Sequence, residues 1–432
     1  MNRVPACLLL VLCSTFPASL SATPFAYVTN ESDNTVSVID TSDQSVAATI
    51  DVGNAPIGAA VAPEGNRVYV ANRDGASISV IDTATNTVSD TIAVAGAPLG
   101  VVVGPDSDWV YASDLGLGTV LVIDAGTNTV SDTVSVGASP MGIDIAPDGS
   151  RVYVANSVGN SISIIDTTDN SVVETITVGA RPIALAVTPD GSRVYVSNFD
   201  DNFISVIDTA TNAVIDSIAT SSPLGIASLP DGTRIYAASS SQNSISIIDT
   251  TTNDVVDNIA VGAIPSGIAV SPDGSRVYAS NNGSDDVSVI DTKSDFVVTA
   301  VDVGEAPNVL GKFIGTPPDM IPDAFTFEDQ FDLETNAEAV SNTITVSGIS
   351  TDSPISIIGC SSATCEYSIN DGPYTSDPAT VGNGDAVAVR QITADSQNTT
   401  TTLTLDIGGV SDDFNATTLQ LDPIFADRFA ID

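Results

Sequence analysis

A repeat of about 42 residues runs through residues 25–315 and limits the folds that this chain can adopt. Segments ending in Ile-Asp recur at intervals of 42, 42, 42, 42, 41 and 42 residues and place their aspartates at Asp40, Asp82, Asp124, Asp166, Asp208, Asp249 and Asp291. A tyrosine and a proline recur at the same intervals, beginning at Tyr27 and Pro56 and ending at Tyr278 and Pro307. Three markers with a common spacing indicate seven copies of one structural unit.

Each copy contains four short runs of alternating, β-branched-rich sequence with turn-forming residues between them. In one copy the runs are PIALAVTP, RVYVSN, FISVIDT and AVIDSIAT, within residues 182–220. The turn after the first run is Pro-Asp-Gly-Ser, in which Gly191 can adopt the positive φ of a tight turn. Four antiparallel strands per copy, without helices, are typical of propeller blades. The sequence therefore predicts an all-β chain that contains a seven-bladed β-propeller.

The two ends of the repeat are out of phase with each other. The first tyrosine precedes the first marker proline, so the chain enters the repeat at the second strand of a blade. After Pro307 only one further strand, residues 307–315, belongs to the repeat. We expect this strand to join strands within residues 25–52 in a composite blade, because that pairing closes the ring and leaves no free edge between blades.

The repeated segments resemble a known family. YVTN (27–30), YVAN (69–72 and 153–156) and YVSN (195–198), together with SVIDTATN and PDGSRVYV, are similar to the YVTN-type β-propeller repeats of secreted and surface proteins. The resemblance covers residues 25–315. It implies an exported propeller and implies little about chemistry.

Residues 1–22 have the three-part form of a secretory signal peptide, with Arg3 before an apolar run and small residues after it. A buried apolar segment or a membrane anchor is the alternative, but the run is shorter than the ~20 residues that a spanning helix needs. We therefore expect an exported protein of the periplasm, cell surface or extracellular space. No later segment is apolar enough to predict a membrane span.

Residues 316–323 break the repeat with three prolines and are predicted to be a linker. Residues 324–432 contain about seven short alternating runs, which predict a small antiparallel β-sandwich. The stretches SNTITVSGI, YSINDGPYT and NGDAVAVR resemble an immunoglobulin-like module of exported bacterial proteins. The terminal DPIFADRFAID is similar to short tails on such proteins, where it implies sorting; a disordered or docked tail is the alternative.

Cys360 and Cys365 are the two cysteines outside the signal segment. Two thiols cannot complete a tetrahedral metal site, and in an oxidising compartment they predict a disulfide that staples a hairpin. Free thiols are the alternative. A loop this short stabilises the fold by only about 2 kcal/mol in the chain-entropy model.

Composition excludes several classes of function. The chain has no histidine, so catalytic triads, imidazole bases and His-ligated zinc or haem are excluded. Its net charge of −42 repels a phosphate backbone, which argues against a nucleic-acid partner. The sequence also contains no Gly-rich phosphate loop and no nucleophile elbow.

The strand order places the first-to-second and third-to-fourth turns at one end of the propeller, and these turns are nearly identical in every copy. We therefore expect the seven Ile-Asp aspartates to accept hydrogen bonds within their own turns. The arginines before the marker tyrosines are expected to pair with nearby carboxylates; they are Arg67, Arg151, Arg193, Arg234 and Arg276.

The loops at the opposite end differ from copy to copy, and binding residues tend to lie on variable loops of a rigid scaffold. The candidate ligand contacts on this variable face are Arg73, Asp74, Asp114, Arg181, Phe199, Asp200, Asp201, Asp285 and Asp286. A merely solvated acidic face is the alternative. The pairs at 200–201 and 285–286 offer hard oxygen ligands for calcium, although no EF-hand-type loop is present; no other cofactor is indicated.

Two further candidates lie on the first strands, which border the central channel. Asp144 and Lys312 are the charged residues at the fourth and fifth positions after the marker prolines. We expect both to reach channel water, where they could face each other across the axis. If they mark a binding site, Asp144→Ala should abolish binding with little loss of stability. Satisfaction of each group by local backbone is the alternative.

Two functions remain open. The first is a non-catalytic exported propeller that binds a protein, glycan or ion through the variable face. The second is a periplasmic hydrolase or lactonase-like enzyme that uses carboxylates in the channel, for which converging carboxylates in the channel mouth would be the signature.

Overall fold

The computed structural model describes residues 24–317, 324–349, 351–362 and 364–420. These residues divide into two compact units, one before and one after residues 318–323. The predicted signal peptide, most of the predicted linker and the terminal tail lie outside the described residues. Each unit is described below by itself.

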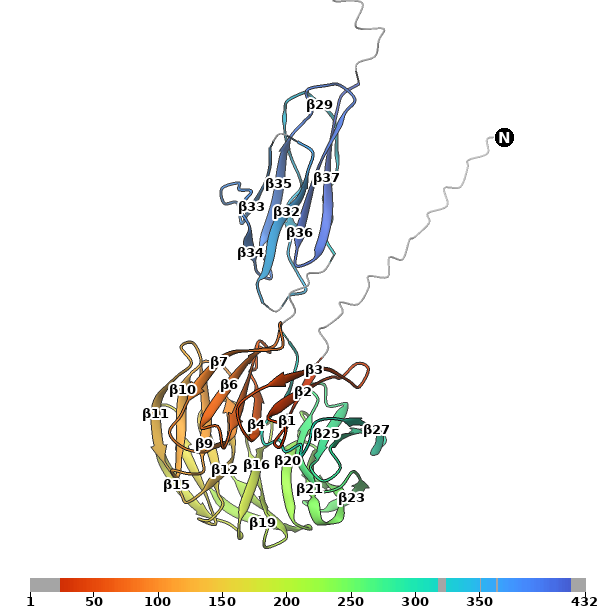
Figure 1. Cartoon of the computed structure of the whole chain (residues 1–432). Coiled ribbons are helices and arrows are strands. Elements are labelled where there is room, and N and C mark those ends of the chain that lie inside the picture. Colours follow the sequence, from red (N-terminus) through yellow and green to blue (C-terminus); the bar gives the residue numbers. More distant parts are fainter. Residues whose placement is uncertain (1–23, 318–323, 350, 363, 421–432) are drawn as a thin grey trace, which may run out of the picture. The chain divides into compact units, whose positions relative to one another are not determined.

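The first unit consists of four-stranded antiparallel sheets whose strands follow one another along the chain. In Figure 1, β4, β12, β16 and β20 lie toward the centre and β11, β15, β19 and β23 toward the periphery. The first two sheets of consecutive strands are β4 (Pro56–Val61), β5 (Arg67–Asn72), β6 (Ser77–Asp82) and β7 (Thr87–Ala93), and then β8 (Pro98–Val103), β9 (Trp109–Asp114), β10 (Thr119–Asp124) and β11 (Thr129–Ser135). The next two are β12 (Pro140–Ile145), β13 (Arg151–Asn156), β14 (Ser161–Asp166) and β15 (Ser171–Thr177), and then β16 (Pro182–Val187), β17 (Arg193–Asn198), β18 (Phe203–Asp208) and β19 (Ala213–Ala219). They are followed by β20 (Pro223–Ser228), β21 (Arg234–Ser239), β22 (Ser244–Asp249) and β23 (Val255–Ala260), and by β24 (Pro265–Val270), β25 (Arg276–Asn281), β26 (Asp286–Asp291) and β27 (Phe296–Asp302). One 3-10 helix, η1 (Ser240–Gln242), lies between β21 and β22.

A further four-stranded sheet joins the two ends of this unit. It has the order β28-β1-β2-β3, in which β28 (Ile314–Gly315) pairs antiparallel with β1 (Phe25–Asn30), and β2 (Thr35–Asp40) and β3 (Ser45–Asp51) follow. The N–H of Tyr27 donates to the carbonyl of Phe313 at 2.8 Å, and the N–H of Asn308 donates to the carbonyl of Thr29 at 3.1 Å. The segment 307–315 therefore runs beside β1, as the out-of-phase repeat predicts.

The same segment also bonds to the neighbouring sheet. The N–H groups of Ala59 and Val61 on β4 donate to the carbonyls of Leu310 and Lys312 at 3.1 and 3.0 Å. The last strand thus fills the space between β1 and β4, and satisfies backbone groups of both. Without it, the inner edges of two sheets would present unpaired N–H groups.

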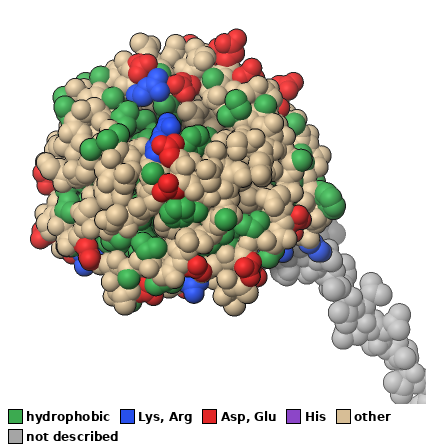
Figure 2. Space-filling view, turned by 90° about the horizontal axis from the view of Figure 1, so that it is seen from below, with side chains coloured by type: hydrophobic (Ala, Val, Ile, Leu, Met, Phe, Trp, Pro, Cys, Tyr) green, Lys and Arg blue, Asp and Glu red, His purple; other side chains and the backbone are tan. Residues whose placement is uncertain are grey.

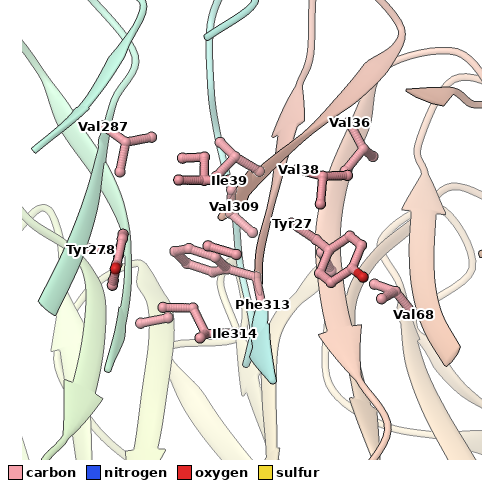
Figure 3. Packing of buried hydrophobic residues seen from close by; sticks show 14 of the residues in the cluster. Tyr27, Val36, Val38, Ile39, Val68, Tyr278, Val287, Val309, Phe313 and Ile314 are labelled. Atoms are coloured by element: carbon pink, nitrogen blue, oxygen red, sulfur yellow. The ribbon is translucent and has the colours of Figure 1, made fainter. Parts of the chain in front are cut away.

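Apolar side chains between sheets form the core of this unit. Figure 3 shows Phe313 and Val309 between Tyr27 and Val38 on one side and Tyr278 on the other. Phe313 is fully buried, and it belongs to one cluster with side chains from the first and the last sheets. The alternating pattern of the strands explains this packing, because residues two apart on one strand face the same neighbouring sheet.

The prediction for the Ile-Asp aspartates is confirmed: each of the seven accepts a hydrogen bond from a backbone N–H two or three residues later, in its own turn. The hydroxyl of Thr211 and its N–H lower the pKa of Asp208, and similar donors lower the pKa of Asp166, Asp249 and Asp291. The aspartates of the Pro-Asp-Gly turns also accept hydrogen bonds from N–H groups of their own turns. Hydrogen bonds from Thr188 and Ser192 lower the pKa of Asp190 from 3.8 to about 2.

The prediction for the five repeated arginines is confirmed in part. Arg151 and Arg276 pair with Asp166 and Asp291 of their own sheets, and Arg234 reaches Asp295 of the next sheet at 2.9 Å. The other two bond carbonyls instead: Arg67 donates to Ala125 at 2.6 Å and Arg193 donates to Thr250 at 2.5 Å. These carbonyls belong to turns of the next sheet, so the arginines connect neighbouring sheets.

The second unit packs two sheets around one apolar core that includes Ile355, Leu405, Tyr367 and Val389. One sheet has the order β29 (Gln330–Leu333), β37 (Val410–Thr418), β36 (Thr400–Ile407), β32 (Ser353–Cys360) and β34 (Ala379–Val381); the other contains β30 (Glu338–Val340), β35 (Ala386–Ile392), β31 (Ile344–Thr345) and β33 (Cys365–Ile369). The prediction of a purely antiparallel sandwich is wrong in one place, because β29 pairs parallel with β37.

The predicted disulfide between Cys360 and Cys365 is present, with a Cα–Cα distance of 6.1 Å. It does not staple a hairpin, however. Cys360 ends β32 in one sheet and Cys365 begins β33 in the other, so the bond ties the two sheets together where the chain crosses between them.

We expect Phe313→Ala to lower the free energy of unfolding of the first unit by about 3–5 kcal/mol, because the ring is fully buried between sheets. Phe296→Ala is the matched control, since this ring is 71% exposed on β27 and its loss should cost less than about 0.5 kcal/mol. Urea unfolding measures both. Equal losses for the two variants would contradict this account of the packing.

Acid should selectively remove the contribution of the turn aspartates. The folded pKa of Asp190 is about 2, below its ordinary 3.8, so its stabilisation is present above pH 3.8 and is lost as the pH falls through 2. Asp190→Asn should therefore lower the urea midpoint at pH 7, and the difference from the wild type should narrow between about pH 4 and pH 2. A difference that stays constant over this range would show that the carboxylate charge is not the stabilising feature.

Candidate axial pocket

A pocket of about 390 Å³ occupies the centre of the first unit. Its wall is formed by β8, β12, β16, β20 and β24 and by residues 309–314. These are the first strands of their repeats, and most side chains that face the pocket are small or aliphatic, such as Val102, Ala186, Ala227 and Val270. The volume falls in the range of small-molecule sites.

Buried apolar side chains lie next to the marker prolines, toward the variable face. Ile57 and Leu99 belong to one buried cluster with Leu310 and with Ala184 and Ile226 of β16 and β20. Side chains from sheets that are not consecutive in the chain therefore pack together at this end.

The other end of the pocket reaches the regular turns. Its lining includes exposed prolines of the Pro-Asp-Gly turns, namely Pro147, Pro189, Pro230 and Pro272. The pocket therefore opens on the regular face, opposite to the face that the variable loops indicate.

Asp144 lies in the pocket wall on β12 and is 5% exposed. Its Oδ1 accepts from the N–H of Ile145 at 2.9 Å, and its Oδ2 accepts from the N–H of Val187 on β16 at 2.9 Å. The carboxylate thus bridges two neighbouring sheets at a point where other repeats have alanine, valine or glycine.

Lys312, which belongs to the segment 307–315, is the third partner of the Asp144 carboxylate. Its Nζ lies 2.9 Å from Oδ1 of Asp144, while its side chain is 64% exposed. Gly311 precedes it with a φ of 124°, and a Cβ at that position would lie 2.6 Å from the carbonyl oxygen of Ala59. Only glycine fits this bend, which is followed by the lysine that enters the pocket.

The two channel candidates are therefore brought together as an ion pair. The prediction that both reach water is right for Lys312 and wrong for Asp144, whose oxygens are held by backbone N–H groups and the lysine. With these contacts, Asp144→Ala is instead expected to cost stability, because the substitution leaves the N–H groups of Ile145 and Val187 without this acceptor.

The candidates on the variable face are mostly bonded to one another. Arg73 lies 2.8 Å from Asp74 and 3.0 Å from Glu31, and its hydrogen bond lowers the pKa of the Asp74 carboxyl. Arg181 lies 3.5 Å from Asp200 and stacks over Phe199, with its guanidinium carbon 4.9 Å from the ring centroid. The Arg181–Asp200 contact is exposed and the Arg73–Glu31 contact is half-buried, and each is confined to neighbouring loops.

The remaining candidates support the loops themselves. Asp201 accepts from the N–H of Ala180 at 2.6 Å, Asp285 from the N–H of Ala306 at 2.8 Å, and Asp286 from the side chain of Asn281 at 2.5 Å. In the part of the chain that the structure describes, no three acidic or cysteine side chains gather as a metal site would require. Figure 2 shows one face of the molecule, on which acidic side chains are scattered and basic ones are few.

The prediction that Asp114 contacts a ligand at the surface is wrong, because this residue is fully buried beneath its loop. Its Oδ1 accepts from the N–H groups of Ala97, Gly116 and Leu117 at 3.0–3.1 Å. Five other repeats have a buried asparagine at the same place, and this correspondence in the sequence indicates an internal residue.

The sequence predicts a central channel, but it does not predict the aliphatic pocket that the structure shows there. A usable signal was present: the fourth position after the marker proline is alanine at 60, 186, 227 and 269 and glycine at 311, and small residues at one level of most inner strands leave the axis open. The buried side chains toward the variable face could not be recognised, because they come from strands far apart in the sequence.

The sheets arranged around a central pocket define the first unit as a β-propeller. A family model of YNCE-like beta-propellers matches residues 226–315. No curated protein matches the sequence. In the part of the chain that the structure describes, no helix has the length and apolar character that a membrane crossing needs.

Solved structures similar to this chain are also propellers. Hydrazine synthase of Kuenenia stuttgartiensis shares 23% identity, with 65% of this chain and 99% of that chain covered and a TM-score of 0.57. A functionally unknown protein from Desulfotomaculum acetoxidans shares 18% identity, with coverage of 68% and 98% and a TM-score of 0.60. The dihydro-heme d1 dehydrogenase NirN, in complex with DHE, shares 17% identity, with coverage of 67% and 66% and a TM-score of 0.51. At these identities the similarity shows the fold alone.

We expect Asp144→Ala to lower the free energy of unfolding by about 2–4 kcal/mol, since it leaves the N–H groups of Ile145 and Val187 without their acceptor and Lys312 without its ion-pair partner. Asp148→Ala, at an exposed turn of the same sheet, is the control and should cost less than about 1 kcal/mol. Urea unfolding decides the matter; a loss at 144 no larger than that at 148 would mean that the carboxylate does not bridge the sheets.

Proposed function

We propose that this protein is an exported, non-catalytic binding protein whose propeller takes a small, mainly apolar molecule into the axial pocket. The observation that supports this most directly is the pocket itself, which has aliphatic walls and a single ion pair. Small-molecule sites have this composition, with few polar groups that orient the ligand.

The axial pocket is a better candidate than the variable face. On that face the charged side chains pair with one another or hold their own loops, so few of their hydrogen-bonding groups are left for a partner. A protein or glycan at the cell surface or in the periplasm remains the proposed partner of this face.

An enzyme that uses two carboxylates is the alternative function, and the pocket gives it little support. Asp144 is the only carboxylate among the described residues that line the pocket, and its neighbour is an ammonium group. Acid–base chemistry with two carboxyl groups, as in glycoside hydrolysis, requires a second one nearby.

We further propose that the sheets of the first unit form a closed ring of seven YVTN-type blades, with β28 and β1–β3 as the composite blade. The pairing of β28 with β1 and the burial of Phe313 support this closure. The sandwich that follows is proposed to be an immunoglobulin-like module. The disulfide between its sheets supports export, since such bonds persist in oxidising compartments.

A ligand screen tests the pocket directly. A small-molecule library is screened by thermal shift against the full chain, with and without calcium, and hits are measured by calorimetry. Ala227 is half-buried in the pocket wall, so Ala227→Phe should fill the cavity and weaken binding of the hits by about tenfold or more.

Ala47→Phe is the matched control, because Ala47 is exposed on the outer strand β3. It should leave the affinity of the hits unchanged. Hits that bind both variants as they bind the wild type would place the binding site elsewhere. An effect of calcium on binding or melting would point to the acidic loops at 200–201 and 285–286.

A further inference from the structure

We infer that the axial pocket selects molecules without net charge that carry one hydrogen-bond acceptor, such as aliphatic ketones, esters or alcohols, in preference to carboxylates and amines. This inference rests on the proposed function and specifies its ligand. It follows from how the two charged groups of the pocket are already used.

Asp144 has little to offer a ligand. Two backbone N–H groups and Lys312 occupy its oxygens, and its side chain is 7% exposed. A ligand amine would have to displace Lys312 from this carboxylate, and would approach the lysine's own positive charge. A cationic ligand is therefore disfavoured.

Lys312 does have donors to offer. An ammonium group carries three N–H bonds, and Asp144 is the only partner of the Lys312 ammonium group among the described residues. Because its side chain is 64% exposed, N–H groups remain accessible from the pocket. A ligand oxygen can accept from them without disturbing the ion pair.

The charge of the ion pair decides between a neutral and an anionic acceptor. Lys312 and Asp144 together carry no net charge, so a bound carboxylate would give the site a charge of −1 within a chain of net charge −42. The carboxylate would also lose hydration between aliphatic walls, which is costly for an ion that has no dedicated counter-charge. A carbonyl oxygen gains the same hydrogen bond at a smaller desolvation cost.

The other described residues of the wall supply no competing side-chain donor. The two serine hydroxyls in the lining are used internally: Ser228 donates to the carbonyl of Leu229 at 3.1 Å, and Ser271 donates to Asp273 at 2.6 Å. Among the described side chains that line the pocket, the ammonium group is thus the one with N–H groups available to a ligand, and it fixes the position of the ligand's acceptor.

Three probes of equal chain length test this inference: 2-octanone, octanoate and octylamine, each titrated calorimetrically into the full chain at pH 7. We expect 2-octanone to bind about tenfold or more tightly than either charged probe. Octanoate binding as tightly as 2-octanone would overturn the inference while leaving the pocket function intact. If none of the three binds and the library screen finds no ligand that Ala227→Phe weakens, the proposed function fails and the inference fails with it.

Removal of the counter-charge should reverse the preference. Asp144→Asn keeps the shape of the side chain and leaves Lys312 uncompensated, so octanoate should gain about tenfold and overtake 2-octanone. Asp148→Asn, at the exposed turn of the same sheet, is the control and should change neither affinity. An unchanged preference for the ketone in Asp144→Asn would overturn the inference.

A second variant covers the case in which Asp144→Asn does not fold. Lys312→Gln retains an N–H donor without charge, so 2-octanone should bind within about threefold of the wild type and octanoate more weakly still. Tighter binding of octanoate to this variant would contradict the charge-balance argument.

Discussion

The structure depends on the hydrogen bonds that residues 307–315 make to strands on both of its sides. A sheet edge with unpaired N–H and C=O groups is costly when buried and prone to association when exposed. Here one segment bonds to β1 through Phe313 and Asn308, and to β4 through Leu310 and Lys312. The same segment supplies the apolar Leu310 to the buried cluster next to the marker prolines and the ammonium group to the pocket wall. The segment that joins the two ends of the repeat region therefore also builds part of the pocket.

One recurring residue of the third turn forms a polar contact between neighbouring sheets. An asparagine in the third turn donates to an acidic residue on the outer strand of the preceding sheet, as Asn128 does to Asp90 at 2.9 Å and Asn212 does to Glu174 at 2.7 Å. In the sheet β24–β27 this asparagine is replaced by Asp295, which would face the acidic outer strand of the preceding sheet. Arg234 pairs with it at 2.9 Å and provides the positive charge that the exchange requires.

Much of the fold could be predicted because equivalent positions of a repeat have equivalent surroundings. The strands, the turn role of the Ile-Asp aspartates and the pairing of 307–315 with β1 follow from spacing alone. Local spacing could not show that Ile57, Leu99 and Leu310 share one buried cluster with Ala184 and Ile226, because these residues lie far apart in the sequence. It could not show that the disulfide joins two sheets, because the change of sheet after Cys360 is a tertiary feature. The informative departures were Asp144, Gly311 and Lys312, each unlike its counterparts in the other repeats.

The acidity of the chain is explained largely by the chemistry of its turns. Aspartate at the end of a strand accepts from N–H groups that the turn would otherwise leave unpaired, and these bonds favour the ionised form. Each repeat uses such a residue after its third strand, and most use another in the Pro-Asp-Gly turn, as Asp148, Asp190, Asp231 and Asp273 do. Because these two turn residues recur along the chain, their carboxylates add up to a large negative charge. No cationic ligand is needed to explain it. The pocket carries no share of this charge, because Lys312 balances Asp144 there. The net charge of the chain is therefore a poor guide to the chemistry of its ligand, and the balanced pair in the pocket is a better one.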